Sequence, residues 1–296
     1  MSDKIAVVLL NYNGIKDSLE CIESIRKSSV FEKITILFVD NNSKKDETLI
    51  VNENYPEILT FKSKQNNGFS AGNNIAIKYA LKNNFDYILL LNNDTIIDSE
   101  MVEYLLLNCN ENTITVPKMY YYNNPNLIWY GGGKINRFTG NSTHLFKDKN
   151  DINDYSNRLV TFCTGCCMMI SAKTFKRYGL LPEDYFMYCE DTDFSINALM
   201  NGIKLLYVPK AKLWHKVSAS TGGDESEFSI YYMTRNRILY IKKYHKYFFA
   251  TALPFTIATR IIRMFQLILK RKKTSSAFWK GIVDGICGVK GKIDLD

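Results

Sequence analysis

Two short acidic segments of this 296-residue chain carry the residue types best suited to chemistry. In the first, LLLNNDT, Asp94 follows an apolar run, where a carboxylate can hold Mg²⁺ or Mn²⁺ beside a phosphate group. In the second, EDTDF, Glu190 and Asp191 follow the aromatic run 185–188. An ionised aspartate can take a proton from a hydroxyl group. A cation at a departing diphosphate and a base at a hydroxyl are the parts of a group-transfer reaction.

Each segment also has a purely structural interpretation. Asn and Asp commonly form turns where strands end, which would account for Asp94 without a metal. Acidic residues in the first turn of a helix complement the helix dipole, which would account for Glu190 and Asp191 without catalysis. The elements that position these residues therefore have to distinguish the two interpretations.

Buried strands alternate with helices in the first part of the chain. Continuous apolar runs at Ile5–Leu10, Ile34–Val39 and Tyr87–Leu91 predict strands that are covered on both faces. Helical periodicity follows at Ser18–Lys27 and again at about 73–81. This alternation predicts an α/β fold with a Rossmann-like, mostly parallel sheet flanked by helices.

Polar clusters follow three of these strands, at Asn11–Gly14, Asp40–Ser43 and Asn92–Asp94. In open parallel sheets, ligands bind beyond the carboxyl ends of the strands. We therefore expect a binding site at that edge of the sheet. Gly68 and Gly72 do not form a G-x-G-x-x-G pattern, so a dinucleotide cofactor is not expected.

The middle of the chain is less regular. From about Val116 to Arg158 the pattern predicts a long loop or hairpin excursion. A strand is expected at Thr161–Ile170 and another at Lys204–Val208. Helices are expected near Ala172–Tyr178 and from about residue 191 onward.

The basic charge is concentrated in the C-terminal tail. The whole chain has a formal net charge of +8, but the part from Arg235 onward has +11 and the part before it −3. Across 255–270 the polar residues share one helical stripe, and basic residues follow at Lys270–Lys273. Two arginines and Pro254 make this stretch a poor membrane span. We expect an amphipathic helix on an anionic membrane surface, with packing on the globular domain as the alternative.

Cysteine content and the start of the chain bear on the compartment. The chain has 7 cysteines, and MSDKIAVVLLNYNG enters a strand without a signal-peptide pattern, so free thiols in the cytosol are expected. Cys163, Cys166 and Cys167 have a metal-like spacing but no second cluster, so a structural role is favoured.

Six motifs occur in an order that resembles the family-2 inverting glycosyltransferases of GT-A fold, and within them the rhamnosyltransferase-like branch of bacterial polysaccharide assembly. The resemblance covers roughly residues 4–240. The motifs are LNYNG, VDNNSKKD, NNGFSAGNN, LLLNNDT, YFMYCEDTDF and AKLWHKVSAS.

The resemblance implies a role for each matching residue. Asp191 corresponds to the catalytic base, with Glu190 as its acidic neighbour, and Asp94 and His215 correspond to groups that hold the divalent cation, Mg²⁺ or Mn²⁺. Asp40 corresponds to the residue that binds the pyrimidine base. The other residues implied to lie at the nucleotide are Asn11, Asn13, Asn67, Asn92 and Arg235. Asn92 departs from the frequent Asp-x-Asp metal motif, which removes one negative charge from the site.

The resemblance also implies a domain organisation. Residues 1–240 would form the GT-A domain, with a nucleotide-binding half at about 1–115 and an acceptor-binding half at about 116–240. Residues 241–296 would form the basic amphipathic helical tail. The implied location is cytoplasmic, peripheral on the inner face of the cell membrane.

The implied reaction moves one sugar, with inversion, from dTDP-rhamnose or a UDP-hexose to a hydroxyl of a glycan or lipid-linked acceptor. Two alternatives remain at this stage. A sugar-phosphate nucleotidyltransferase shares the sheet type but would carry a basic Gly-rich loop where this chain has LNYNG. A non-enzymatic membrane- or nucleic-acid-binding module would use the basic tail, although no nucleic-acid motif accompanies it, so no nucleic-acid partner is expected. The sequence leaves the oligomeric state open.

Overall fold

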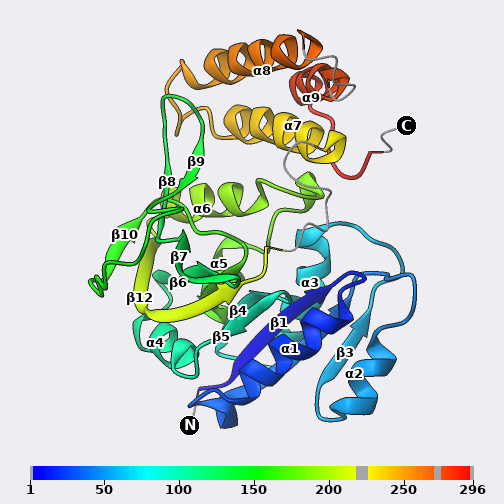
Figure 1. Cartoon of the computed structure of the whole chain (residues 1–296), viewed down its shortest axis with the longest axis vertical. Coiled ribbons are helices and arrows are strands. Elements are labelled where there is room, and N and C mark those ends of the chain that lie inside the picture. Colours follow the sequence, from blue (N-terminus) through cyan, green and yellow to red (C-terminus); the bar gives the residue numbers. More distant parts are fainter. Residues whose placement is uncertain (1–2, 218–225, 270–274, 294–296) are drawn as a thin grey trace.

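A large mixed sheet forms the centre of the molecule in this computed structural model, which describes residues 3–217, 226–269 and 275–293 (Figure 1). Its principal strands lie in the order β10-β12-β6-β11-β4-β1-β2-β3. Helices cover both faces of this sheet, and three further helices form a separate layer at the top of the view in Figure 1. The predicted α/β class with a mostly parallel sheet and flanking helices is confirmed.

The N-terminal half is the parallel part of the sheet. β1 pairs in parallel with β2 on one side and with β4 on the other, and Asn11 lies opposite Asp40. The apolar runs of these strands are buried because helices pack on both faces. The elements are β1 (Ile5–Asn11), α1 (Ile15–Arg26), β2 (Ile34–Asp40), α2 (Thr48–Asn54), β3 (Leu59–Lys62), α3 (Phe69–Lys82) and β4 (Tyr87–Asn92).

The second half extends the sheet with strands of both directions. β11 is antiparallel to β4 and β6, whereas β12 runs parallel to β6. β8 and β9 form a separate small hairpin. The elements are β5 (Thr95–Ile97), α4 (Met101–Asn108), β6 (Thr113–Tyr121), β7 (Asn124–Tyr130), β8 (Gly133–Ile135), β9 (Ser142–His144), β10 (Arg158–Val160), β11 (Cys167–Ser171), α5 (Ala172–Tyr178), α6 (Glu190–Met200) and β12 (Lys204–His215).

The predicted irregular region from Val116 in fact begins inside a core strand. β6 is buried almost throughout, although Pro117 and Lys118 interrupt its apolar pattern. Lys118 is only 2% exposed because its ammonium group pairs with Asp151 at 2.9 Å. A lysine that is buried by pairing with a distant carboxylate leaves no local sequence pattern of burial. Hydrophobic periodicity alone therefore does not predict this strand.

Three helices follow the sheet: α7 (Glu227–Lys243), α8 (Ala252–Leu269) and α9 (Ser275–Cys287). By length and composition α8 also meets the minimum for a membrane-crossing helix. Its polar stripe faces the protein, since Thr256 is buried, while Ile262 and Phe265 are 57% and 56% exposed. The tail therefore packs on α7 through both polar and apolar residues, among them Thr256, Leu267 and Phe278, and α8 also carries exposed apolar residues on its outer side. The predicted basic run Lys270–Lys273 lies outside the described residues.

Leu89→Ala should destabilise the fold by about 2–5 kcal/mol, because Leu89 is fully buried in the central strand β4 and its removal leaves a cavity. The free energy of unfolding from urea titration measures this loss. Leu107→Ala is the matched control, since Leu107 is 73% exposed and its truncation should change stability little. Equal losses for the two variants would contradict the placement of β4.

Candidate active site

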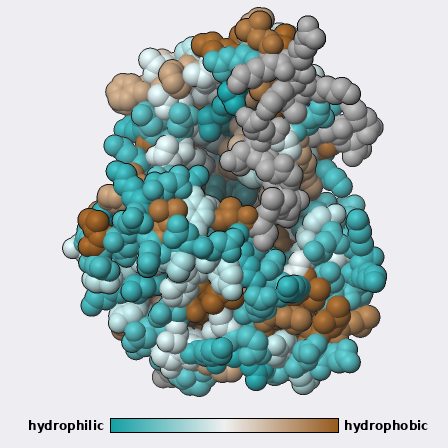
Figure 2. Space-filling model, viewed as in Figure 1, coloured by the Kyte–Doolittle hydropathy of each residue, from teal (hydrophilic) through white to brown (hydrophobic). Residues whose placement is uncertain are grey.

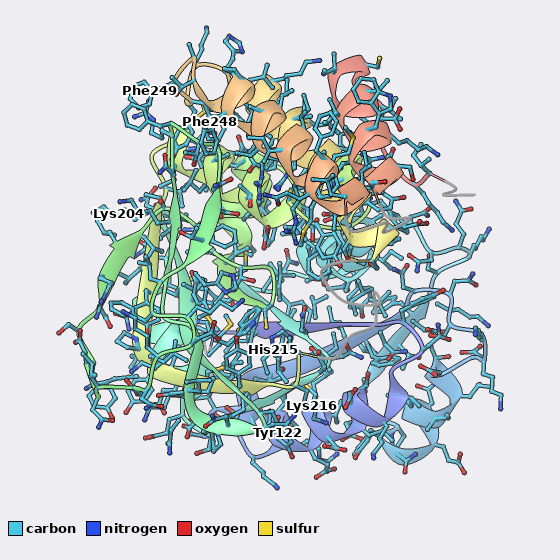
Figure 3. The ribbon with its side chains drawn as sticks, turned by 45° about the horizontal axis from the view of Figure 1, so that its top comes forward. Tyr122, Lys204, His215, Lys216, Phe248 and Phe249 are labelled. Carbon is cyan, nitrogen blue, oxygen red and sulfur yellow. The ribbon has the colours of Figure 1, made fainter. Side chains whose placement is uncertain are left out.

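Asp94 and His215 meet because two strands pair in one register. Asp94 directly precedes β5, and β5 lies antiparallel to the end of β12 with Thr95 opposite His215. This register places Asp94 Oδ1 3.1 Å from His215 Nε2. Figure 3 shows His215 and Lys216 at this end of β12. Burial disfavours the imidazolium, but Cys166 and Asp94 outweigh it and raise the pKa of His215 to about 10.

Glu190 and Asp191 open helix α6 with unequal environments. Asp191 accepts backbone N–H bonds from Gly165 at 3.1 Å and from Thr192 at 2.7 Å. Glu190 is only 8% exposed, and its Oε2 atom has no partner among the described residues. Burial raises the pKa of both carboxyl groups, well above the ordinary range for Glu190, whereas the N–H donors oppose the rise at Asp191. The proton of the pair therefore belongs on Glu190, and Asp191 is the carboxylate.

One short segment before β11 separates the two acidic groups. The Gly165 N–H donates to Asp191, and the next carbonyl, that of Cys166, accepts the N–H of Asn92 at 2.8 Å. A Cβ atom on Gly165 would lie 3.2 Å from the Phe69 ring and 3.6 Å from Asp191 Cβ. The Cys166 side chain also hydrogen-bonds His215, so this two-residue segment contacts both Asp191 and the Asp94–His215 pair.

The chain just before α6 is strained. Phe186, Tyr188 and Cys189 have φ values of 64°, 67° and 71°, a region that residues other than glycine rarely adopt. The Phe186 carbonyl accepts the N–H of Phe69 at 2.8 Å, and a Cβ atom on Gly68 would lie 1.9 Å from the same oxygen. The loop before α3 therefore needs glycine to approach this segment. Such strain persists only where the surroundings enforce it.

Helix α7 supplies that enforcement. The Asn236 side-chain amide donates to the carbonyl oxygens of Tyr185, Met187 and Tyr188 at 3.1, 2.7 and 2.9 Å. Arg235 donates to the Tyr185 carbonyl at 2.9 Å and to the Gly291 carbonyl at 2.8 Å. The strained segment is thus held from α7 through its backbone oxygens.

Arg235 corrects one prediction from the sequence. It is fully buried, its guanidinium lies 4.7 Å from the Tyr232 ring centre, and it bonds backbone carbonyls rather than facing the sheet edge. A phosphate has no access to a side chain in that position. Arg235 holds the segment before α6, and the predicted phosphate contact is wrong.

Asp40 is the last residue of β2, and one of its two carboxylate oxygens accepts a hydrogen bond. Its Oδ1 atom accepts the N–H of Ser43 at 3.2 Å, whereas Oδ2 is buried without a partner among the described residues. A buried, unpartnered carboxylate oxygen is rare in native structures and indicates a missing hydrogen-bond donor. Asn41 Oδ1 and Ser70 Oγ share this condition; both residues lie in motifs that carry the family resemblance, but neither was singled out by sequence as a site residue.

Asn11 also differs from the prediction. It is fully buried, and its amide donates to Glu47 at 2.6 Å while its oxygen accepts from Ser18 at 2.9 Å and from Asn93 at 3.1 Å. With these bonds made, Asn11 joins the loops at the sheet edge instead of lining a nucleoside pocket.

The other predicted amides lie at the same edge. Asn13 and Asn67 are exposed in the loops after β1 and before α3, and Asn92 is half-buried at the end of β4. Tyr12 was missed by the sequence reasoning, although it stands between two predicted residues, and its ring is 49% exposed. An exposed aromatic ring directly after a buried strand is the signal that could have found it.

The fold, with polar and acidic groups at the carboxyl edge of its parallel strands, is that of an α/β enzyme, and comparison with known proteins gives the family. Glycosyl transferase family 2 matches residues 6–179, and the chain belongs to this family. The hexosyltransferase Agl10 of low-salt glycan biosynthesis in Haloferax volcanii is 27% identical, over 81% of this chain and 76% of its own. The dTDP-rhamnosyl transferase RfbF of Shigella flexneri is 24% identical over 98% of both chains.

Solved structures show the same fold. The mannosyltransferase PcManGT from Pyrobaculum calidifontis, in complex with GDP-Man and Mn²⁺, superposes with a TM-score of 0.60 at 11% identity, over 97% of this chain and 88% of that one. The chain is thus a family-2 glycosyltransferase, and its curated relatives include hexosyl- and rhamnosyltransferases. The nucleotidyltransferase and the non-enzymatic module are set aside.

Asn236→Ala should lower kcat about tenfold or more and destabilise the protein by about 1–3 kcal/mol, because three carbonyls lose their donor and the segment before Asp191 relaxes. Steady-state kinetics and thermal unfolding measure the two effects. Asn201→Ala is the control, since the exposed Asn201 amide bonds only neighbouring atoms of its own helix. Wild-type kcat in Asn236→Ala would show that the strained segment needs no support.

The acidic limb of the kcat/KM profile should lie above pH 3.8, the ordinary pKa of an aspartate, because burial raises the pKa of Asp191 and the base works only as a carboxylate. Activity therefore rises with pH through the raised pKa. Glu190→Gln should leave that limb nearly in place, since Glu190 is already neutral there. A large fall of the limb in Glu190→Gln would mean that the proton assignment is reversed.

Proposed function

We propose that this glycosyltransferase inverts the configuration of the transferred sugar and depends on a divalent cation. The observation that carries this proposal is that two adjacent residues contact both groups: Gly165 bonds the Asp191 carboxylate, and Cys166 bonds His215 of the Asp94–His215 pair. A base and a cation site so placed serve the two ends of a direct displacement.

In this proposal the donor lies along the ends of β1, β2 and β4. The unpartnered Asp40 Oδ2 accepts the ring N–H of a pyrimidine base, which uracil and thymine both carry. Tyr12 offers an exposed ring for stacking, and Asn13 and Asn67 offer exposed amides. The donor is dTDP-rhamnose or a UDP-hexose, and RfbF is itself named as a dTDP-rhamnosyl transferase.

Asp94 and His215 would hold the cation, and the residues fit one. They offer an oxygen donor and, once the cation displaces the imidazolium proton of His215, a nitrogen donor 3.1 Å away, a set that suits Mn²⁺ better than Mg²⁺, which prefers oxygen ligands. Among the described residues no three His, Cys, Asp or Glu side chains gather at one point, so the donor diphosphate has to complete the site. When bound, the cation neutralises charge on the departing diphosphate.

Asp191 acts as the base in the proposed reaction. It takes the proton of the acceptor hydroxyl, whose oxygen forms a bond to the anomeric carbon from the face opposite the diphosphate. The bond from that carbon to the diphosphate breaks, and its electron pair leaves with the nucleoside diphosphate. Neutral Glu190 adds no charge beside Asp191 and so does not oppose the approach of the anionic donor.

The acceptor is a glycan or a lipid-linked saccharide, and the reaction takes place at the inner face of the membrane. Residues 1–115 bind the donor and 116–240 the acceptor, while the tail 241–296 attaches to the bilayer. The support is the outer face of the tail, where hydrophobic residues gather over α8 at the top of Figure 2. An exposed apolar helix face beside a basic segment is typical of peripheral membrane attachment.

Asp191→Asn should reduce transfer by at least about a thousandfold while Mn²⁺-dependent nucleoside-diphosphate binding survives, since only the proton acceptor is lost. Asp94→Asn should instead weaken Mn²⁺-dependent binding. Calorimetry with UDP and dTDP, with and without Mn²⁺, together with sugar-transfer assays, separates the two losses. Near-normal turnover in Asp191→Asn would remove its role, and unchanged metal dependence in Asp94→Asn would remove the metal site.

A further inference from the structure

The imidazole ring of His215 is held at the candidate cation site by few hydrogen bonds. Its Nε2 atom lies 3.1 Å from Asp94 Oδ1, whereas Nδ1 is buried without an oxygen or nitrogen partner in the part of the chain that the structure describes. The Cys166 thiol, which bonds the ring, is only a weak hydrogen-bonding group. Metal-binding histidines usually fix their ring through a strong hydrogen bond at the second nitrogen. The orientation of this ring therefore has to come from packing.

Trp129 supplies that packing from β7. The centre of its ring lies 4.5 Å from the centre of the His215 ring, and the two ring planes meet at 76°. Edge-to-face contacts of this kind are attractive beyond the apolar area that they bury. β7 and β12 both pair with β6, so strands of one sheet present the indole and the imidazole. Contact with the indole thus limits how far the His215 ring can turn.

His144 in β9 holds Trp129 in place. Their ring centres lie 4.6 Å apart with the planes at 80°, and the His144 Nδ1–H group donates to the Trp129 carbonyl at 3.1 Å. Tyr130 and Phe162 pack on the same imidazole, with ring centres 5.0 and 5.9 Å away. Burial lowers the pKa of His144 to about 4, so its ring is neutral at neutral pH and adds no positive charge near the cation site. We call His144, Trp129 and His215 the aromatic row.

β9 is also connected to the turn that carries the proposed base. Ser142 and His144 are two residues apart in this strand and therefore point to the same face. The Ser142 hydroxyl accepts from Thr192 Oγ1 at 3.2 Å, and Thr192 directly follows Asp191. One strand is thus linked to the base through Ser142 and to the cation pair through the aromatic row.

We propose that Trp129, supported by His144, is a positioning residue that turns the His215 ring toward the cation of the donor diphosphate. Trp129 acts through His215 and offers no ligand atom of its own. The terminal torsion of a histidine side chain is broad unless a neighbour restricts it, so loss of the indole leaves fewer rings in the orientation that binds. This inference rests on the proposed function and adds the residue that sets cation affinity at that site.

The test measures Mn²⁺ binding to the full chain from the electron paramagnetic resonance signal of free Mn²⁺, at a saturating concentration of UDP or dTDP, whichever binds more tightly. Trp129→Leu should weaken Mn²⁺ binding about tenfold, whereas Trp129→Phe, which keeps a ring beside His215, should recover most of the affinity. Nucleotide binding without Mn²⁺ should be unchanged in both variants. His144→Leu should have a smaller effect in the same direction, because it removes only the support of Trp129.

Trp214→Leu is the matched control. Trp214 directly precedes His215 in β12, so its side chain points to the opposite face of the strand, where it stacks on Tyr120 with ring centres 6.0 Å apart. This variant loses a comparable packing contact and should leave Mn²⁺ affinity unchanged. Thermal unfolding of both leucine variants reports the loss of stability separately from the loss of Mn²⁺. Wild-type Mn²⁺ affinity in Trp129→Leu would overturn the proposal, and so would an equal loss in Trp214→Leu.

Fluorescence tests the same contact without removing it. The chain has 3 tryptophans, and in a Trp214→Phe, Trp279→Phe background only Trp129 gives indole emission. Mn²⁺ is paramagnetic and quenches an indole beside it, so bound Mn²⁺ should quench this emission more strongly than bound Mg²⁺. His215→Ala should abolish the difference. Bound Mn²⁺ without quenching would mean that the cation lies away from Trp129, and it would contradict the inference even where Trp129→Leu fails to fold.

The two ligand variants separate this inference from the proposed function. Asp94→Asn and His215→Ala should each weaken Mn²⁺ binding more than Trp129→Leu does. A loss in both ligand variants with no loss in Trp129→Leu would leave the cation site standing and remove the positioning role. Unchanged Mn²⁺ binding in both ligand variants would remove the cation site itself, and the positioning role with it.

Discussion

The hydrogen bond from the Gly165 N–H to the Asp191 carboxylate is the contact on which the rest of the site depends. It fixes the first turn of α6 against the segment that enters β11, and the same segment receives the N–H of Asn92 from β4. Asp191 lies 26 residues from Gly165, and Asn92 lies 74 residues from Cys166. These two bonds therefore attach both residues to the same short backbone segment. A Cβ atom at Gly165 would lie 3.2 Å from the Phe69 ring, which is a tight contact, and in ordinary contact with Asp191.

The residues just before α6 are strained because they have to place the first turn of α6 against Gly165. Phe186, Tyr188 and Cys189, which lie between Tyr185 and Glu190, have positive φ values. Such conformations cost free energy for residues other than glycine. Helix α7 offsets this cost through the Asn236 amide and the Arg235 guanidinium, both aimed at backbone oxygens. Helix α7 is therefore connected to the start of α6 through these hydrogen bonds.

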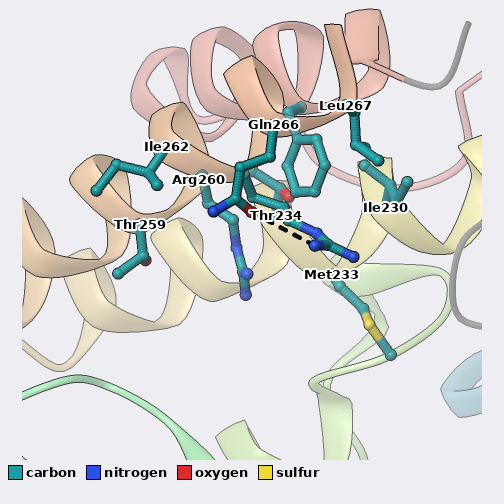
Figure 4. A pocket seen from close by; sticks show the side chains of 10 residues that line it. Ile230, Met233, Thr234, Thr259, Arg260, Ile262, Gln266 and Leu267 are labelled. Atoms are coloured by element: carbon teal, nitrogen blue, oxygen red, sulfur yellow. Dashed lines mark hydrogen bonds between the residues drawn. The ribbon is translucent and has the colours of Figure 1, made fainter. Parts of the chain in front are cut away.

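The tail has the opposite polarity from an ordinary surface helix. In α8 Thr256 and Arg260 face the protein together with Leu267, whereas several other hydrophobic residues, such as Ile262 and Phe265, face outward. Figure 4 shows Arg260 pointing from α8 toward α7. In water this arrangement exposes apolar area and desolvates cations, so both halves of it are unfavourable. A bilayer surface outside would make the exposure of the apolar residues favourable, and the membrane attachment proposed above supplies this condition.

The sequence by itself determined the α/β class, the parallel strands and the edge of the sheet where Asp40, Asn92 and Asp94 gather, because continuous apolar runs and the polar residues that end them are local patterns. It also predicted α5 at its observed bounds and the start of α6 within one residue. It did not predict β6, in which the buried Lys118 pairs with the Asp151 carboxylate, 33 residues away.

Only the tertiary structure decided which polar residues face a ligand. Asn11 and Arg235 read as binding residues by type and position, yet both are saturated by contacts inside the protein. The pairing of Asp94 with His215 depends on the register between β5 and β12, 121 residues apart along the chain. The direction of the polar stripe in α8 depends on what α7 offers it. Hydrogen-bond partners distant in sequence leave no periodic trace, and for that reason burial of polar groups is decided by the fold alone.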